Sequence, residues 1–311
     1  MNNINIEFNS PNQYNNPTSI KLQTLIKRVN MRKKLIYSLV VSLISIIRVY
    51  SQEVILYKRV DSVKLHMEVY LPENIDRATN YPALVFFFGG GWKGGSIHQF
   101  KKQAEYFTKR GMVCFLVDYR VENRHMTTPF ESLKDAKSAI RFIRANYEKF
   151  HIDPSRITAS GGSAGGHLAV ATALIEDYNE STDDLMVSSI PDALILYNPV
   201  IDNGPGGYGF ERIGDAYKSF SPLHNIREGA PPTIIFLGTK DNLIPVETVK
   251  YYQIVMQKVG SLCEVVLYEG RGHGFFNYDR HFEYYKKTLI ETDRFLQYLG
   301  YIEKEPVIEI R

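Results

Sequence analysis

The chain has 311 residues, of which 44% are hydrophobic and 23% are charged. This is the composition of an ordinary globular protein, and it excludes an intrinsically disordered chain, a collagen-like chain and a polytopic membrane protein. The formal net charge of +3 would by itself suggest an anionic partner such as nucleic acid. The two cysteines, Cys114 and Cys263, are too few for a disulfide-stapled scaffold or a four-cysteine zinc site, and we expect both to be buried and unpaired.

The basic excess belongs to the first 51 residues. They contain seven Lys or Arg residues and one acidic residue, Glu7, a net charge of +6 within a total of +3. Residues 52–311 therefore carry a formal charge of −3. This distribution removes the argument for nucleic acid, and we predict no nucleic-acid partner.

The N-terminal segment has the features of an export leader. Residues 1–30 are rich in Asn and predict a disordered extension. A basic start at Met31 is then followed by a 13-residue apolar run over 35–47 and by a cleavage region, the three parts of a secretory signal peptide over 31–51. The run is shorter than the roughly 20 residues of a membrane-spanning helix, so we expect a cleaved signal and export rather than a stable membrane anchor. A signal at this place also predicts that translation starts at Met31.

From residue 53 onward, short β-rich runs alternate with longer helical patterns. Eight strands are expected, over 54–60, 64–71, 83–88, 112–117, 157–159, 193–197, 233–237 and 263–268. Five helices are expected, over 99–110, 132–147, 165–175, 246–259 and 281–299. Most of the strands are apolar throughout, as in parallel sheets covered by helices. The pattern predicts one α/β domain over 52–311 with a mostly parallel eight-stranded sheet flanked by helices.

The strongest chemical signal is a G-x-S-x-G sequence, Gly161 to Gly165, between an expected strand and an expected helix. This context is typical of a nucleophile elbow, in which glycines permit a sharp turn and expose the serine hydroxyl. Ser163 is therefore the candidate nucleophile, and the amide of Ala164 is a candidate oxyanion donor. His167, four residues further on, is expected to pack beneath the elbow.

A serine nucleophile needs a base and a carboxylate that orients the base. In this architecture the order along the chain is Ser, then Asp or Glu, then His, with each residue after a strand. Asp241 follows the strand over 233–237 and His273 follows the strand over 263–268. Both are candidate catalytic residues, and Glu247 is the reserve carboxylate.

The loop after the strand over 83–88 contains three consecutive glycines followed by the only tryptophan, Trp92. Glycine amides can approach a substrate closely, so Gly90 and Gly91 are further candidate oxyanion donors. Trp92 is a candidate for lining the substrate pocket, and packing within the loop is the alternative role.

A second glycine-rich segment, Gly204 to Gly209, matches G-x-G-x-x-G. No confident helix follows it directly, and Pro205 stiffens the segment, so it lacks the strand-to-helix turn of a dinucleotide site. We interpret it as a loop beside the active site, in which Tyr208 and Phe210 shape substrate access.

With these residues placed, the chain resembles the α/β-hydrolase fold, and within it the acetyl esterase and carboxylesterase branch with an HGGGW-type oxyanion loop. The resemblance covers residues 53–300 and rests on these segments: Gly89-Gly90-Gly91-Trp92, Asp118-Tyr119-Arg120, residues 153–157, Gly161 to Gly165, Asp241 and His273. The chain is also similar to exported acetylxylan and feruloyl carbohydrate esterases. Phe88 stands where the HGGGW loop has its histidine, and its side chain cannot hydrogen-bond to the loop backbone.

The resemblance implies a serine esterase that removes short acyl groups, above all acetyl, from carbohydrate or related esters. Neither a metal nor a cofactor is expected. A prolyl-oligopeptidase-like serine peptidase and a non-catalytic carbohydrate-binding relative are the alternatives. The sequence leaves the acyl group, the alcohol and the oligomeric state open.

Overall fold

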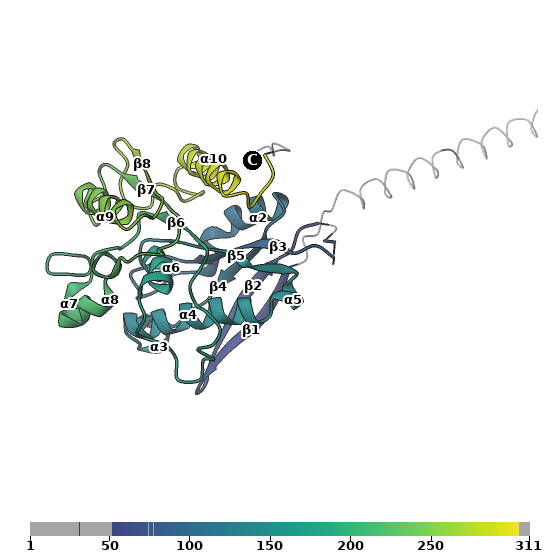
Figure 1. The fold of residues 1–311 in the computed structure, drawn as a ribbon, viewed down its shortest axis with the longest axis horizontal. Helices are drawn as coiled ribbons and strands as arrows, with labels where there is room; N and C mark the ends of the chain where they lie inside the picture. The colour runs from purple at the N-terminus through teal and green to yellow at the C-terminus, as the bar shows by residue number, and fades with distance from the viewer. Residues whose placement is uncertain (1–30, 32–51, 74, 77, 305–311) are drawn as a thin grey trace, which may run out of the picture. The chain divides into compact units, whose positions relative to one another are not determined.

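The computed structural model describes residue 31, residues 52–73, 75–76 and 78–304 (Figure 1). The predicted disordered extension over 1–30 lies outside the described residues, as does the predicted signal peptide apart from Met31. The described residues from Gln52 onward belong to one compact unit. Within the described ranges, no helix combines the length and the hydropathy that a membrane span requires.

One eight-stranded sheet forms the centre of this unit, in the order β1-β2-β4-β3-β5-β6-β7-β8. Its strands are β1 (Gln52–Val60), β2 (Val63–Tyr70), β3 (Tyr81–Phe87), β4 (Val113–Val117), β5 (Ile152–Gly162), β6 (Ala193–Tyr197), β7 (Thr233–Gly238) and β8 (Cys263–Tyr268). β2 pairs antiparallel with both β1 and β4, and every other pair is parallel. The predicted α/β fold with a mostly parallel eight-stranded sheet is thus confirmed.

Helices cover both faces of the sheet. The longer ones are α2 (Lys101–Lys109), α4 (Pro129–Ala145), α6 (Ala164–Leu174), α9 (Val246–Lys258) and α10 (Phe282–Tyr298). Figure 1 shows α2 and α10 side by side, away from α4. Along β3, Val85 and Phe87 join the apolar cluster that contains residues of α4 and α6, whereas Leu84 and Phe86 join the cluster that contains residues of α2 and α10. Because successive side chains along a strand point to opposite faces of the sheet, β3 contributes to the apolar core on both faces.

The short helices lie in the loops, and the sequence patterns did not indicate them. They are α3 (Glu122–His125), α5 (Tyr147–Phe150), α7 (Phe210–Ile213), α8 (Tyr217–Phe220) and the 3₁₀ segments Ile97–Phe100, Gly214–Ala216 and Pro222–Asn225. α4 begins three residues before its predicted start, because Thr128 and Glu131 form a capping box around Pro129. Cys114 in β4 and Cys263 in β8 are buried and free, as predicted.

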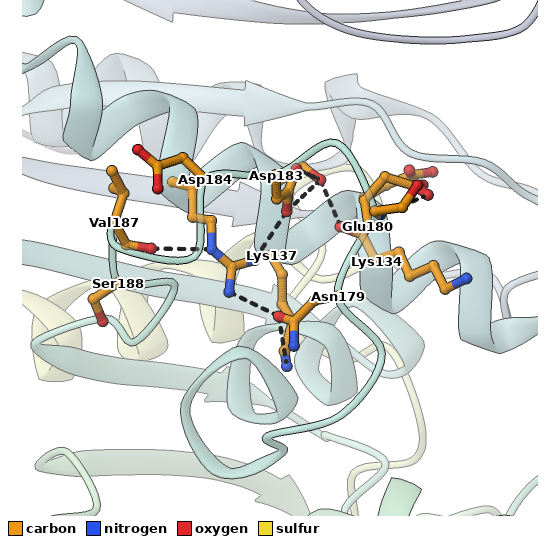
Figure 2. A network of polar contacts seen from close by, with 12 residues as sticks. Lys134, Lys137, Asn179, Glu180, Asp183, Asp184, Val187 and Ser188 are labelled. Atoms are coloured by element: carbon orange, nitrogen blue, oxygen red, sulfur yellow. Dashed lines mark hydrogen bonds and ion pairs between the residues drawn. The ribbon is translucent and has the colours of Figure 1, made fainter.

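Polar contacts from α4 hold the long loop between α6 and β6 (Figure 2). Arg141 donates hydrogen bonds to the Val187 carbonyl at 3.0 Å, to Asp183 at 2.9 Å and to Asn179 at 2.7 Å. Lys137 is almost fully buried and donates to the carbonyls of residues 176 and 177. Burial lowers the pKa of the Lys137 ammonium to about 8. Arg141 and Lys137 therefore hold the loop through hydrogen bonds to its backbone carbonyls, and the role of these two side chains is structural.

Candidate active site

Ser163 occupies a sharp turn between β5 and α6. Its backbone has φ 55° and ψ −118°, a strained conformation for a residue with a side chain. The turn packs tightly against the end of β3, because a Cβ atom on Gly165 would lie 2.1 Å from the Phe87 carbonyl oxygen. Glycine at this position therefore lets the first turn of α6 approach the sheet, and Ser163 projects from the helix N-terminus.

The three predicted catalytic side chains lie in one hydrogen-bonded line. Oγ of Ser163 lies 2.9 Å from Nε2 of His273, and Nδ1 of His273 lies 2.8 Å from Oδ2 of Asp241. The Asp241 carboxylate is fully buried, and its Oδ1 accepts hydrogen bonds from the amides of Leu243 and Ile244 at 2.9 and 3.0 Å. These amides fix the carboxylate, so Nδ1 of His273 carries the hydrogen and Nε2 is the acceptor that faces the serine.

Asn198, directly after β6, was not indicated by the sequence. Its Oδ1 accepts a hydrogen bond from the Gly274 amide at 2.9 Å, which fixes the orientation of the side-chain amide. Its Nδ2 then faces Nε2 of His273 at 3.3 Å. Asn198 is buried, with a positive φ of 36° that Asn tolerates better than most residues. The rule that functional residues follow parallel strands could have found this residue, because β6 adjoins β5.

The glycine loop after β3 presents free backbone amides. Within the described part of the chain, the amides of Gly90, Gly91 and Ala164 have no hydrogen-bond partner. Gly90 and Gly91 have φ values of 137° and 64°, and a Cβ on Gly90 would lie 2.2 Å from the Gly94 carbonyl oxygen. Only glycine fits this turn without rearrangement. The predicted donors thus remain available to a ligand at Ser163.

Side chains from outside the glycine loop hydrogen-bond to its backbone. Tyr119 donates a hydrogen bond to the Phe88 carbonyl at 2.6 Å, and the two rings stack with centroids 4.1 Å apart. Arg212 donates to the Gly91 carbonyl at 2.6 Å. The carbonyls of Phe88 and Gly91 are therefore both held by side chains from outside the loop.

A chain of amide hydrogen bonds connects the glycine loop to the loop that carries His273. Gly89 N–H donates to Oε1 of Gln99 at 2.6 Å, and Nε2 of Gln99 donates to Oδ1 of Asn277 at 2.9 Å. Nδ2 of Asn277 then donates to the Gly274 carbonyl at 2.8 Å. Because a backbone N–H and a backbone carbonyl terminate the chain, both side-chain amides have one possible orientation.

A cavity of about 320 Å³ opens over Ser163 and His273. It is lined by Gly89, Gly90, Gly91, Gln99, Ser163, Asn198, Tyr208, Leu243, His273, Gly274, Phe276, Asn277 and Arg280. Of the three candidate pocket residues, Tyr208 lines this cavity. Trp92 is 1% exposed and packs against His167 and Tyr208, so packing, the alternative role, is the one it has here. Phe210 does not line the cavity and packs against Tyr217.

His167 lies beneath the elbow rather than in the cavity. Its Nε2 lies 3.1 Å from the Phe220 carbonyl oxygen, and its ring stacks on the Phe220 ring. Complete burial lowers the pKa of His167 to about 3, so the ring is neutral. Among the described residues, no group of His, Cys, Asp and Glu side chains could hold a metal ion.

The fold and this geometry define an α/β hydrolase. Residues 67–203 match the family described as BD-FAE, and residues 197–300 match the dienelactone hydrolase family. The structure is similar to Thermogutta terrifontis esterase 2 phosphoramylated by tabun, with a TM-score of 0.79 and 45% identity over 82% of this chain and 97% of that one. The propionate-bound form of the same esterase is 44% identical with a TM-score of 0.78, over 82% of this chain and 97% of that one.

Two curated relatives are more distant. The probable isoprenylcysteine alpha-carbonyl methylesterase ICMEL1 of Arabidopsis thaliana is 27% identical, and the match covers 68% of this chain and 49% of that protein. The acetylxylan esterase of Xylanibacter ruminicola is 26% identical, over 76% of this chain and 49% of that protein. The chain spans about half the length of these curated relatives. The chain belongs to the α/β-hydrolase family of esterases, whose members are carboxylic ester hydrolases.

Proposed function

We propose that the protein is an exported serine esterase that hydrolyses short-chain acyl esters, acetyl esters above all, of carbohydrates or related alcohols. The observation that carries the proposal is the unbroken line from Asp241 through His273 to Ser163, beside free backbone amides. The relationship to an esterase with a propionate-bound form supports a short acyl group. The relationship to an acetylxylan esterase supports a carbohydrate ester.

Acylation begins when Oγ of Ser163 attacks the carbonyl carbon of the ester and Nε2 of His273 takes the hydroxyl proton. The amides of Gly90, Gly91 and Ala164 donate to the oxyanion, and they are available because nothing within the described part of the chain occupies them. Asp241 holds the ring in the required tautomer and stabilises the imidazolium. His273 then protonates the departing alcohol, which leaves an acyl-serine.

Deacylation repeats these steps with water. His273 removes a proton from water, the hydroxide attacks the acyl carbonyl carbon, and the same amides stabilise the second oxyanion. Collapse of this intermediate returns the proton to Ser163 Oγ and releases the carboxylic acid. Every group needed for both half-reactions is present in the chain, so the proposal requires neither a metal ion nor a cofactor.

A substrate panel tests the acyl and alcohol specificity. The arms are 4-nitrophenyl esters from acetate to octanoate, acetylated xylan, a feruloylated oligosaccharide and a prolyl peptide substrate. We expect the highest kcat/KM with acetate to butyrate and release of acetate from xylan. Cleavage of the peptide at a rate equal to that of the esters would instead support the peptidase alternative, and binding of xylan without turnover would support a carbohydrate-binding protein.

The proposed export rests on residues 31–51 and has its own test. Expression of the full chain in a bacterial host is followed by N-terminal sequencing of the protein from the periplasm or the medium. We expect a product that begins close to Gln52. A product that retains residues 1–30 would contradict both the cleaved signal and the start at Met31.

A further inference from the structure

The substrate cavity contains one charged side chain, Arg280, which no step of the proposed reaction uses. The residues that line the cavity are otherwise amide side chains, glycines, hydroxyl groups, two apolar side chains and the catalytic base His273. No carboxylate is among them. A bound substrate therefore meets a single formal charge, and this charge is positive.

Arg280 lies beside the loop that carries the catalytic histidine. A Cβ on Gly274 would lie 3.0 Å from Nη1 of Arg280 and 3.2 Å from Nδ2 of Asn277. Gly274 has a φ of 80°, so a side chain here would also strain the backbone. Glycine at this position leaves space for the guanidinium one residue from His273.

Arg280 differs in its ion pairing from other arginines in the described part of the domain. Other arginines of the domain pair with carboxylates: Arg120 with Asp135 at 2.8 Å and Arg141 with Asp183 at 2.9 Å. Within the described ranges, no carboxylate lies within ion-pair distance of Arg280, and the side chain is exposed. Its five N–H donors are therefore available to a ligand in the cavity, in a planar geometry that suits a carboxylate.

We propose that Arg280 forms an anion subsite and that the preferred substrates are esters that carry a carboxylate near the scissile bond. This inference rests on the proposed esterase function and specifies its substrate class. Two sources share this chemistry: an alcohol that carries a carboxylate, as in a uronic acid, and an acyl group that carries one, as in a dicarboxylic acid monoester. The side-chain amides of Asn277 and Gln99 also line the cavity and are further polar groups that such a carboxylate would meet.

The experiment compares matched charged and neutral esters in two arms. The alcohol arm uses 3-carboxyphenyl acetate against 3-carbamoylphenyl acetate, and the acyl arm uses ethyl hydrogen succinate against ethyl succinamate. Each kcat/KM is divided by the rate constant for non-enzymatic hydroxide hydrolysis, because the substituents change the intrinsic reactivity. The readout is the ratio of the charged to the neutral ester.

We expect a ratio of about five in one arm, which corresponds to the free energy of a partly exposed ion pair. The arm that shows this ratio identifies whether the subsite binds a carboxylate on the alcohol or on the acyl group. Arg280→Gln should bring this ratio close to one, Arg280→Lys should retain part of it, and 0.5 M NaCl should reduce it. Lys286→Gln, which removes a charge from α10 outside the cavity, should leave it unchanged.

A ratio of one or less in both arms of the wild-type protein would overturn the subsite, and so would a ratio that survives Arg280→Gln. Failure of the underlying esterase function gives a different result, because the neutral esters would then not be hydrolysed at all.

Discussion

The side-chain amide of Asn198 contacts two consecutive residues of the catalytic histidine loop: its Oδ1 accepts from the Gly274 amide at 2.9 Å and its Nδ2 faces Nε2 of His273 at 3.3 Å. The residue that follows β6 therefore positions the loop that follows β8.

Asn198→Asp should lower kcat/KM for 4-nitrophenyl acetate by at least tenfold. The aspartate retains an acceptor for the Gly274 amide, but it replaces the donor that faces His273 with a negative charge that competes with Ser163 for the imidazole. Steady-state kinetics measure the effect, and an unchanged circular dichroism spectrum establishes that the variant is folded. A loss of less than twofold would mean that Asn198 does not position His273.

Gln99→Ala breaks the amide chain between the glycine loop and the histidine loop. We expect kcat to fall about tenfold with KM changed by less than twofold, because the displaced Gly90 and Gly91 amides act mainly on the oxyanion. Binding of phenylboronic acid, which forms a tetrahedral adduct with the serine, should weaken in parallel. His98→Ala, an exposed neighbour, is the matched control. The loss in kcat could disappear once it is corrected for the fraction of titratable active sites. That result would mean that these amide hydrogen bonds stabilise the fold and do not position the oxyanion donors.

Asp241→Asn should reduce kcat roughly a thousandfold to ten thousandfold, because an amide nitrogen opposite Nδ1 forces His273 into the wrong tautomer. The matched control is Glu247→Gln, which alters an exposed carboxylate in the first turn of α9. Equal losses in the two variants would contradict the assignment of Asp241 as the orienting carboxylate.

The burial of His167 should make the stability of the fold sensitive to acid. Its pKa is about 3 in the folded protein and 6.5 in an ordinary environment, so between these values the unfolded chain binds a proton that the folded chain does not. The free energy of unfolding therefore falls as the pH is lowered below 6.5, by about 1.4 kcal/mol per unit.

Urea denaturation at pH 6.5 and pH 5 measures this effect. Between the two conditions the wild-type protein should lose about 2 kcal/mol more stability than His167→Gln. His281→Gln, an exposed histidine at the start of α10, should behave like the wild type. Identical losses for wild type and His167→Gln would show that His167 does not cause acid sensitivity.

Most of the fold could be predicted from the sequence, because the spacing of apolar residues follows directly from which positions of a strand or helix are buried. β7 and β8 were placed to within one residue, since parallel strands covered on both faces are apolar throughout. β5 is much longer than predicted, because its start at Ile152 and its end at Gly162 lie in polar and glycine-rich sequence. Chain order and strand ends also indicated Ser163, Asp241 and His273.

The supporting contacts could not be predicted in the same way. Gln99 and Asn277 are 178 positions apart, and neither belongs to a local pattern that marks a partner. Trp92 was a candidate for the pocket because aromatic residues often line one, yet its φ of 57° and its contacts with His167 turn the indole into the core. Such contacts depend on tertiary geometry, which residue type and spacing do not encode.

The central claim is that Ser163 is the nucleophile of a serine esterase. The most direct measurement is labelling of the wild-type protein with a fluorophosphonate, followed by mass spectrometry of the labelled peptide and an assay of 4-nitrophenyl acetate hydrolysis. We expect one label per chain on Ser163, loss of hydrolysis in proportion to labelling, and neither label nor hydrolysis in folded Ser163→Ala. Hydrolysis by Ser163→Ala at more than a trace of the wild-type rate, or a label on another residue, would contradict the claim.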